Sequence, residues 1–189
     1  PHVLFRRQRQ MCIRDSKYGN QLAKIAEKNK VNLEYEAAVC GGIPIIRSIK
    51  DGLITNEINK VYGIFNGTTN FILSSMDFDK LNFESALKKA QSLGYAERNP
   101  KADLAGLDVA DKLRILSALC FNSVIDYKNI HIEGINNIDQ FDVQYANQLG
   151  YKIKLLGLAE RNNKFIVQKV FPDLLKNNSN TAKINGVLN

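Results

Sequence analysis

The stretch GYAERNPKADLAGLDVADKLRILSAL, residues 94–119, decides how the rest of the chain is organised. Its first part, 94–101, is predicted to be a loop, because Gly94, Asn99 and Pro100 break regular structure. Its second part is predicted to be a helix, since apolar residues recur at the three-residue spacing of one helical face. These residues are Leu104, Leu107, Ala110, Leu113, Leu116 and Leu119. The stretch is therefore a loop–helix junction rich in core residues.

Three charged side chains gather at this junction. Asp108 and Lys112 are four residues apart, so they lie one turn apart on the same side of the predicted helix. Glu97 lies in the loop that leads into it. Two carboxylates and an amine can carry acid–base chemistry. They can equally form an ordinary helix-surface ion pair beside a solvated glutamate. We take the junction as the candidate working site.

Composition bounds the class of protein. The chain has 189 residues and is 44% hydrophobic, which is enough for one sizeable core. No apolar run approaches 18 residues and none follows the Arg-rich start, so neither a membrane span nor a secretory signal is expected. The cysteines Cys12, Cys40 and Cys120 are odd in number and widely spaced, which predicts a cytoplasmic protein without disulfides or a zinc site.

The net charge of +7 invites a nucleic-acid interpretation. The lysines are scattered, however, and no basic stripe is interleaved with aromatic residues, so nucleic acid is not an expected partner. Part of the charge lies in residues 1–16, PHVLFRRQRQMCIRDS, which lack helical or strand periodicity. The run RQRQMCIRDS resembles translated sequencing-adaptor sequence. We predict that 1–16 are non-native, with a disordered basic arm as the alternative, and that one domain covers 17–189.

Periodicity and turn signals predict the elements of this domain. Helices are expected at 17–28, from Pro44 onward, after 66–70 with Thr68 and Thr69 as caps, from the N-cap Asn82 to 93 with Gly94 as C′ residue, and at 139–149. Strands are expected at 31–35, 60–65, 130–132, 153–158 and 165–170, with a turn at 161–164. Because strands and helices do not strictly alternate, we expect an α+β fold. Its mixed, mostly antiparallel sheet is covered by helices on one face.

Four motifs carry a family resemblance: YEAAVCGGIPII (35–46), GIFNGTTNFIL (63–73), AQSLGYAERNP (90–100) and DLAGLDVADKLRIL (103–116). In this order and spacing they resemble the catalytic domain of homoserine dehydrogenase. The resemblance implies an oxidoreductase that interconverts L-homoserine and L-aspartate 4-semialdehyde with NAD(P), in threonine, methionine and isoleucine biosynthesis. It also implies a homodimer formed by joining the sheets of two such domains.

The resemblance assigns roles to individual residues. Lys112 matches the catalytic lysine, which moves the proton of the substrate hydroxyl as hydride leaves the adjacent carbon. Glu97 and Asp108 match carboxylates that bind the substrate, and Gly94 matches a cofactor-binding position next to the nicotinamide. Positions whose backbone carbonyls hold a monovalent cation, sodium, in some members are matched by Glu36, Val39, Gly41 and Ile43. A plain strand-to-helix turn is the alternative interpretation of these four.

The sequence also departs from the family pattern. Asn99 precedes Pro100 where the family usually has aspartate, so one local negative charge is lost. The chain contains no strand–GxGxxG–helix unit, which in the family belongs to an N-terminal nucleotide-binding domain. We therefore expect a fragment truncated at both ends. The alternative function is that of a catalytically silent dimerisation module.

Overall fold

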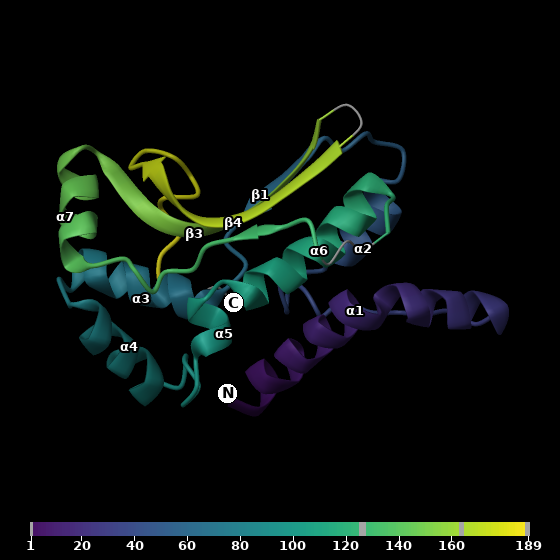
Figure 1. Cartoon of the computed structure of the whole chain (residues 1–189), viewed down its shortest axis with the longest axis horizontal. Coiled ribbons are helices and arrows are strands. Elements are labelled where there is room, and N and C mark those ends of the chain that lie inside the picture. Colours follow the sequence, from purple (N-terminus) through teal and green to yellow (C-terminus); the bar gives the residue numbers. More distant parts are fainter. Residues whose placement is uncertain (1, 125–127, 163–164, 188–189) are drawn as a thin grey trace.

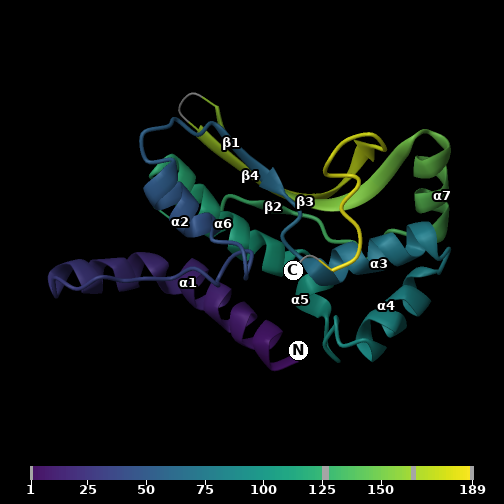
Figure 2. The same ribbon diagram turned by 180° about the vertical axis from the view of Figure 1, so that it is seen from behind.

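The computed structural model describes residues 2–124, 128–162 and 165–187, with side chains from residue 14 onward. A sheet forms one layer, and helices pack against one of its faces (Figures 1 and 2). The helices are α1 (His2–Lys28), α2 (Ile45–Arg47), the π-helical turn η1 (Ser48–Gly52), α3 (Gly67–Phe78), α4 (Phe83–Ser92), α5 (Lys101–Leu104), α6 (Leu107–Phe121) and α7 (Gln140–Gln148). The strands are β1 (Lys60–Gly63), β2 (His131–Ile132), β3 (Tyr151–Asn162) and β4 (Phe165–Lys176).

The sheet has the strand order β1-β3-β4-β2. β3 and β4 pair antiparallel along their whole length, from Tyr151 opposite Lys176 to Asn162 opposite Phe165. β1 adds antiparallel to β3, and β2 adds parallel to β4. The α+β class and the mixed, mostly antiparallel sheet predicted from the sequence are therefore confirmed. Part of the predicted turn at 161–164 lies outside the described residues.

Helix α6 is the centre of the core. Val109 and Leu113 are fully buried and belong to one apolar cluster with Ile72 of α3 and Leu155 of β3. Other residues of α6 join a second cluster with α2 and the turn before it. The helix is apolar on most sides because it lies between the sheet and the outer helices. Leu107 alone departs from the predicted apolar row, since it is exposed.

The break in structure predicted at Lys17 is wrong. α1 runs without interruption from His2 to Lys28 and packs on α6. Asp15 and Ser16 are buried there, and the Ser16 hydroxyl donates to Asp111 Oδ1 at 3.0 Å. No glycine or proline interrupts residues 2–18, so nothing local ends the helix at this point. The helix does not bear on whether residues 1–16 belong to the natural protein. Their non-native origin stays a prediction.

Two further expectations need correction. The helix predicted across 104–119 is two helices, because Gly106 adopts a left-handed conformation with φ 78° between α5 and α6. The strand predicted at 31–35 is absent, because this segment is extended without a pairing partner in the sheet. The N-cap of α4 is confirmed, since the Asn82 side chain accepts from the Ser85 N–H at 2.9 Å.

The end of α5 is held by a close backbone approach. The Ile135 N–H donates to the Leu104 carbonyl at 2.8 Å. A Cβ added to the neighbouring Gly134 would lie 2.0 Å from that carbonyl oxygen and 2.6 Å from Ala105 Cα. These atoms are backbone, so they cannot rotate away. Only glycine fits here without moving α5, and α5 carries a residue of the candidate site.

We therefore expect Gly134→Ala to lower the free energy of unfolding by about 1–3 kcal/mol, the usual cost of overpacking. Gly52→Ala is the matched control, because a Cβ there has no atom within 4 Å. That control is expected to stay within about 0.5 kcal/mol of the parent. Urea unfolding followed by circular dichroism measures both. Equal stability of the two variants would contradict the close approach.

Candidate active site

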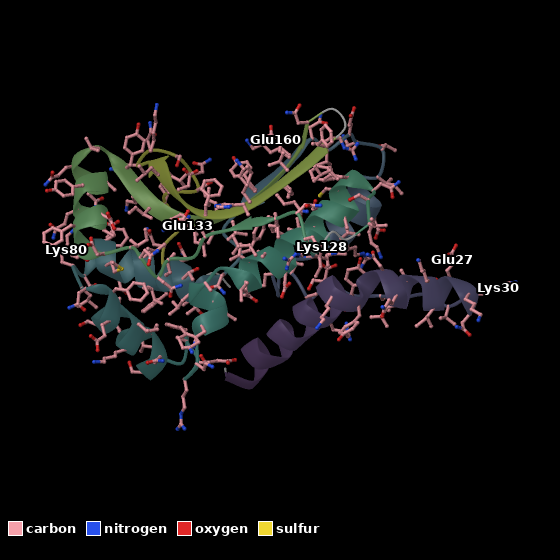
Figure 3. All side chains as sticks on the ribbon, in the orientation of Figure 1. Glu27, Lys30, Lys80, Lys128, Glu133 and Glu160 are labelled. Carbon is pink, nitrogen blue, oxygen red and sulfur yellow. The ribbon has the colours of Figure 1, made fainter. Side chains whose placement is uncertain are left out.

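The candidate site lies where α3, α5 and α6 meet, beside the loop that follows α4 (Figures 1 and 2). Many charged side chains elsewhere are exposed: Glu27, Lys30, Lys80 and Glu160, for example, lie at the rim of the molecule (Figure 3). At the junction, by contrast, Asp103 and Asp108 are buried. A carboxylate is rarely buried unless it is hydrogen-bonded or paired, so the partners of these two carry the argument.

Asn66 connects the two carboxylates. Its Oδ1 accepts the N–H of Thr69 at 2.8 Å, which caps α3 and fixes the orientation of the amide. The Nδ2 therefore faces the other way, and donates to Asp103 Oδ1 at 2.9 Å and to Asp108 Oδ2 at 2.8 Å. Asn66, Asp103 and Asp108 are 5%, 1% and 5% exposed. One side chain thus ties three helices together at a buried polar centre.

The capping residue differs from the one expected. The sequence predicted Thr68 and Thr69 as caps of α3, but Asn66 occupies the N-cap position. The Thr69 hydroxyl instead donates to the Asn66 carbonyl at 3.2 Å, and the Thr68 hydroxyl donates to the Tyr95 carbonyl at 2.6 Å. The prediction was wrong because an asparagine two or three residues earlier is an equally good cap.

Lys112 joins this centre from the next turn of α6. Its Nζ donates to Asp108 Oδ2 at 2.7 Å and to the Phe65 carbonyl at 2.8 Å. The Lys112 side chain is 15% exposed and that of Asp108 is 4% exposed. The pair is therefore largely removed from solvent, unlike an ordinary surface ion pair, and the amine is held by a carboxylate and a main-chain carbonyl together.

Gly94 and Glu97 lie on the loop after α4. Gly94 has φ 82° and its N–H donates to the Gln91 carbonyl at 3.1 Å, so the predicted C′ glycine of this helix is confirmed. The Gln91 side chain donates to the Glu97 carbonyl at 3.1 Å. The hydrogen bond from Thr68 to Tyr95 ties the same loop to the first turn of α3. Glu97 is thus carried on a loop anchored beside the buried network.

The stretch 36–43, the candidate cation turn, begins with a capping interaction. The Glu36 carboxylate accepts the N–H of Ile46 at 2.8 Å and that of Arg47 at 2.9 Å, so the Glu36 side chain caps α2. The Glu36 carbonyl accepts from the Val39 N–H at 3.3 Å, and the Ile43 carbonyl from the Ile45 N–H at 2.8 Å. Each carbonyl oxygen keeps a second lone pair, so these bonds are compatible with a cation.

The turn also lies near the candidate catalytic amine. Burial raises the pKa of the Cys40 thiol, and the positive charge of Lys112 opposes that rise. Cys40 itself has φ 48° and Gly42 has φ 90°, which gives the turn its sharp bend. Among the described residues, no group of three or more His, Cys, Asp and Glu side chains could hold a metal ion. Val39 and Gly41 have no side-chain oxygen, so only their backbone carbonyls could contact a cation.

Asn66 and Asp103 are site residues that sequence reasoning missed. Asp103 and Asp108 are five residues apart, which on one continuous helix separates them by about 140° around the axis. The left-handed Gly106 breaks the helix and brings both carboxylates to the same amide. The available signal was the glycine itself, which marks a possible helix end three residues after Asp103.

The fold and the site define an α+β domain that holds two buried carboxylates and a partly buried lysine at a helix junction. A family model described as homoserine dehydrogenase matches residues 44–189. The chain belongs to the homoserine dehydrogenase family.

Individual relatives agree with this family. The homoserine dehydrogenase of Neisseria gonorrhoeae is 44% identical over 174 residues, which cover 92% of this chain and 40% of the relative. That of Helicobacter pylori is 47% identical over 155 residues, 82% of this chain and 37% of the relative. The crystal structure of a homoserine dehydrogenase from Thiobacillus denitrificans matches with a TM-score of 0.89 at 44% identity, over 92% of this chain and 40% of that one. The chain therefore spans about 40% of the length of the relatives it matches.

The bridging role of Asn66 predicts an unusual mutational result. Aspartate caps a helix as well as asparagine does, but Asn66→Asp would place a third carboxylate between Asp103 and Asp108 and remove their shared donor. We expect it to lower the free energy of unfolding by about 3 kcal/mol, measured by urea denaturation. Asn82→Asp is the matched control, because Asn82 caps α4 at an exposed position. Similar effects of the two changes would contradict the bridge.

Proposed function

We propose that this chain is the catalytic part of an oxidoreductase that interconverts L-homoserine and L-aspartate 4-semialdehyde with NAD(P). The step belongs to threonine, methionine and isoleucine biosynthesis. The observation that carries the proposal is the partly buried Asp108–Lys112 pair, with Nζ to Oδ2 at 2.7 Å, in a chain of this family. A pair of the same spacing on the surface would be exposed to solvent. This pair is largely shielded from solvent, and the Asn66 amide donates a further hydrogen bond to Asp108.

Lys112 is proposed as the proton shuttle. In oxidation its amine takes the proton of the substrate hydroxyl, and in reduction it returns that proton to the carbonyl oxygen. Two hydrogen bonds, to Asp108 and to the Phe65 carbonyl, keep the amine in one place for this transfer. When bound, NAD(P) supplies the acceptor or donor of the hydride. Gly94 is this chain's proposed contribution to the cofactor site, and its left-handed backbone, with φ 82°, favours a residue without a side chain.

The carboxylates are proposed to bind the substrate. Homoserine carries an ammonium group, and carboxylates are its natural partners. Asp108 and Glu97 are the groups proposed for this contact. Asp103 shares the Asn66 amide with Asp108, so it adds a second buried carboxyl group to the same centre.

The proposal extends to a homodimer in the cytoplasm. The sheet is covered by helices on one face (Figure 1). Tyr62 of β1 and Val167 of β4 are exposed. Joining two such sheets would bury this apolar surface. The mass in solution from light scattering tests the dimer, and a monomer mass would contradict it.

Cys40 and Cys120 are free thiols, in keeping with the location predicted from the cysteines. Among the described residues, no helix is both long and apolar enough to cross a membrane.

A second candidate function is a dimerisation module without activity of its own. The observation that favours it is the exposure of Tyr62 and Val167 on strands β1 and β4 of the sheet. Assaying the 189-residue chain beside the complete open reading frame separates the two. Homoserine-dependent formation of NAD(P)H by the complete protein alone would assign activity to the parent protein and leave this chain as its catalytic part.

The role of Lys112 predicts a split between two kinds of variant in the complete protein. Lys112→Ala is expected to lower kcat by about 10²–10⁴-fold, the usual contribution of a general acid–base group. Glu97→Gln is expected chiefly to raise KM for homoserine, because it weakens binding in the ground state. Asp108→Asn is expected to raise KM as well. Steady-state rates of NAD(P)H formation measure all three.

Folding must be preserved for this comparison, so the unfolding transition of each variant is recorded beside its rate. A Lys112→Ala protein that folds and turns over at a near-normal rate would overturn the proton-shuttle role. Unchanged KM values for folded Glu97→Gln and Asp108→Asn proteins would contradict substrate binding by these carboxylates and leave them with a structural role only.

A monovalent cation, sodium, is proposed at the backbone carbonyls of Glu36, Val39, Gly41 and Ile43. The turn adjoins the site through Cys40, so an ordered turn would steady the surroundings of Lys112. Replacing sodium by choline at constant ionic strength should therefore lower activity or thermal stability of the complete protein. Restoring sodium should recover both. Indifference to the exchange would leave 36–43 as a plain strand-to-helix turn.

A further inference from the structure

Lys154 is a buried lysine that the proposed chemistry does not use. It lies on β3 and is 2% exposed. Its Nζ donates to Asn70 Oδ1 of α3 at 2.9 Å and to the carbonyl of Ile184, in the segment after β4, at 2.5 Å. The Ser74 hydroxyl and Asn185 Oδ1 stand farther off, at 3.4 and 3.5 Å. One amine thus joins the sheet, a helix and the last described segment of the chain.

The segment 184–186 meets α3 through its backbone. The Asn70 amide donates to the Gly186 carbonyl at 2.8 Å, and the Gly186 N–H donates to the Ser74 hydroxyl at 3.3 Å. In Figure 1 this part of the chain, drawn in yellow, returns from the end of β4 toward α3. Each of these bonds joins a neutral side chain of α3 to a backbone group of Gly186. Lys154 is the one charged side chain among the partners named here.

The charge of Lys154 is compensated by neutral oxygens. The charged groups that face it are Lys152 on β3 and Asp77 on α3, and Asp77 already pairs with Lys152 at 3.0 Å. Burial, reinforced by Lys152 and opposed by Asp77, lowers the pKa of Lys154 to about 8. Burying a charged amine costs free energy that an apolar side chain of the same length would not. Filling the core is therefore an insufficient reason for a lysine here.

We propose that Lys154 is a positioning residue that latches segment 184–186 onto α3, and so fixes the helix whose N-cap Asn66 bridges the two site carboxylates. Asn70 lies one turn after Asn66 on that helix, so the latch acts within one turn of the site. The effect on catalysis rests on the proposed function. The latch itself does not, because it is a property of the folded chain.

Hydrogen exchange in the 189-residue chain tests the latch directly. Lys154→Met keeps the length of the side chain but removes every donor, so the carbonyl of Ile184 keeps only the long bond from the Asn70 amide, at 3.5 Å. The amides of Ile184 and Gly186 should then exchange about tenfold faster or more, as expected for loss of a buried charge-assisted bond. Lys152→Met is the matched control, since it removes a neighbouring charge from the same strand. Equal exchange in the two variants would overturn the latch.

A strengthening variant covers the case in which Lys154→Met does not fold. Asn185 is exposed, and Asn185→Asp would put a carboxylate where its Oδ1 lies, 3.5 Å from the Lys154 amine, without added volume. Exchange at Gly186 should become a few-fold slower, roughly what a partly exposed ion pair contributes. In combination with Lys154→Met, where that protein folds, the slowing should vanish. No slowing in the single variant would overturn the latch.

Kinetics of the complete protein test the positioning role. Lys154→Met should raise KM for homoserine by about fivefold or more with kcat within about twofold, because the carboxylate geometry loosens while the proton shuttle stays. A merely structural role would lower the active fraction, so kcat would fall at unchanged KM, and that result would overturn positioning. Absence of homoserine-dependent turnover in the parent protein would refute the proposed function, while the exchange data would still decide the latch.

Discussion

The rest of the site depends on the hydrogen bonds made by the side-chain amide of Asn66. Its oxygen caps α3 and its nitrogen holds carboxylates from α5 and α6, so both ends of one planar group are committed. Because the amide plane is rigid, the starts of three helices are placed relative to one another by a single side chain. A carboxylate or hydroxyl could cap the helix, but neither could also donate twice to two carboxyl groups.

The sheet and the central helix supply the rigidity that this bridge needs. α6 is packed on the β3–β4 hairpin by fully buried residues such as Val109 and Leu113. It therefore presents Asp108 and Lys112 from a fixed base. The loop of Glu97 is held by hydrogen bonds from the Thr68 and Gln91 side chains to its carbonyls, and by Ala96, which is buried in the core cluster. The candidate site thus combines residues on rigid helices, Asp108 and Lys112, with Glu97 on a loop. A loop position suits a residue proposed to contact an entering substrate.

Much of this could be predicted from the sequence because the determinants are local. Periodicity found the central helix and the β3–β4 strands, and the spacing of Asp108 and Lys112 correctly put them on one face. Some errors were local, such as the helix break at Gly106, but most of what escaped prediction is non-local. The Asn66 bridge joins residues 37 and 42 positions apart. The same holds for Lys154, whose partners come from α3 and the end of the chain, and for residues 31–35, whose alternating pattern lacks a neighbouring strand.

The left-handed Gly106 has a consequence for how this segment can change in length. It sets the angle around the helix axis between Asp103 of α5 and the pair Asp108 and Lys112 of α6. One added or deleted residue between 103 and 108 would turn Asp103 by about 100° away from the amide, and no side-chain rotation recovers that. Homologous sequences should therefore be free of gaps across this interval. Length variation should collect instead in surface connections, such as the one between η1 and β1, where no site residue depends on the count.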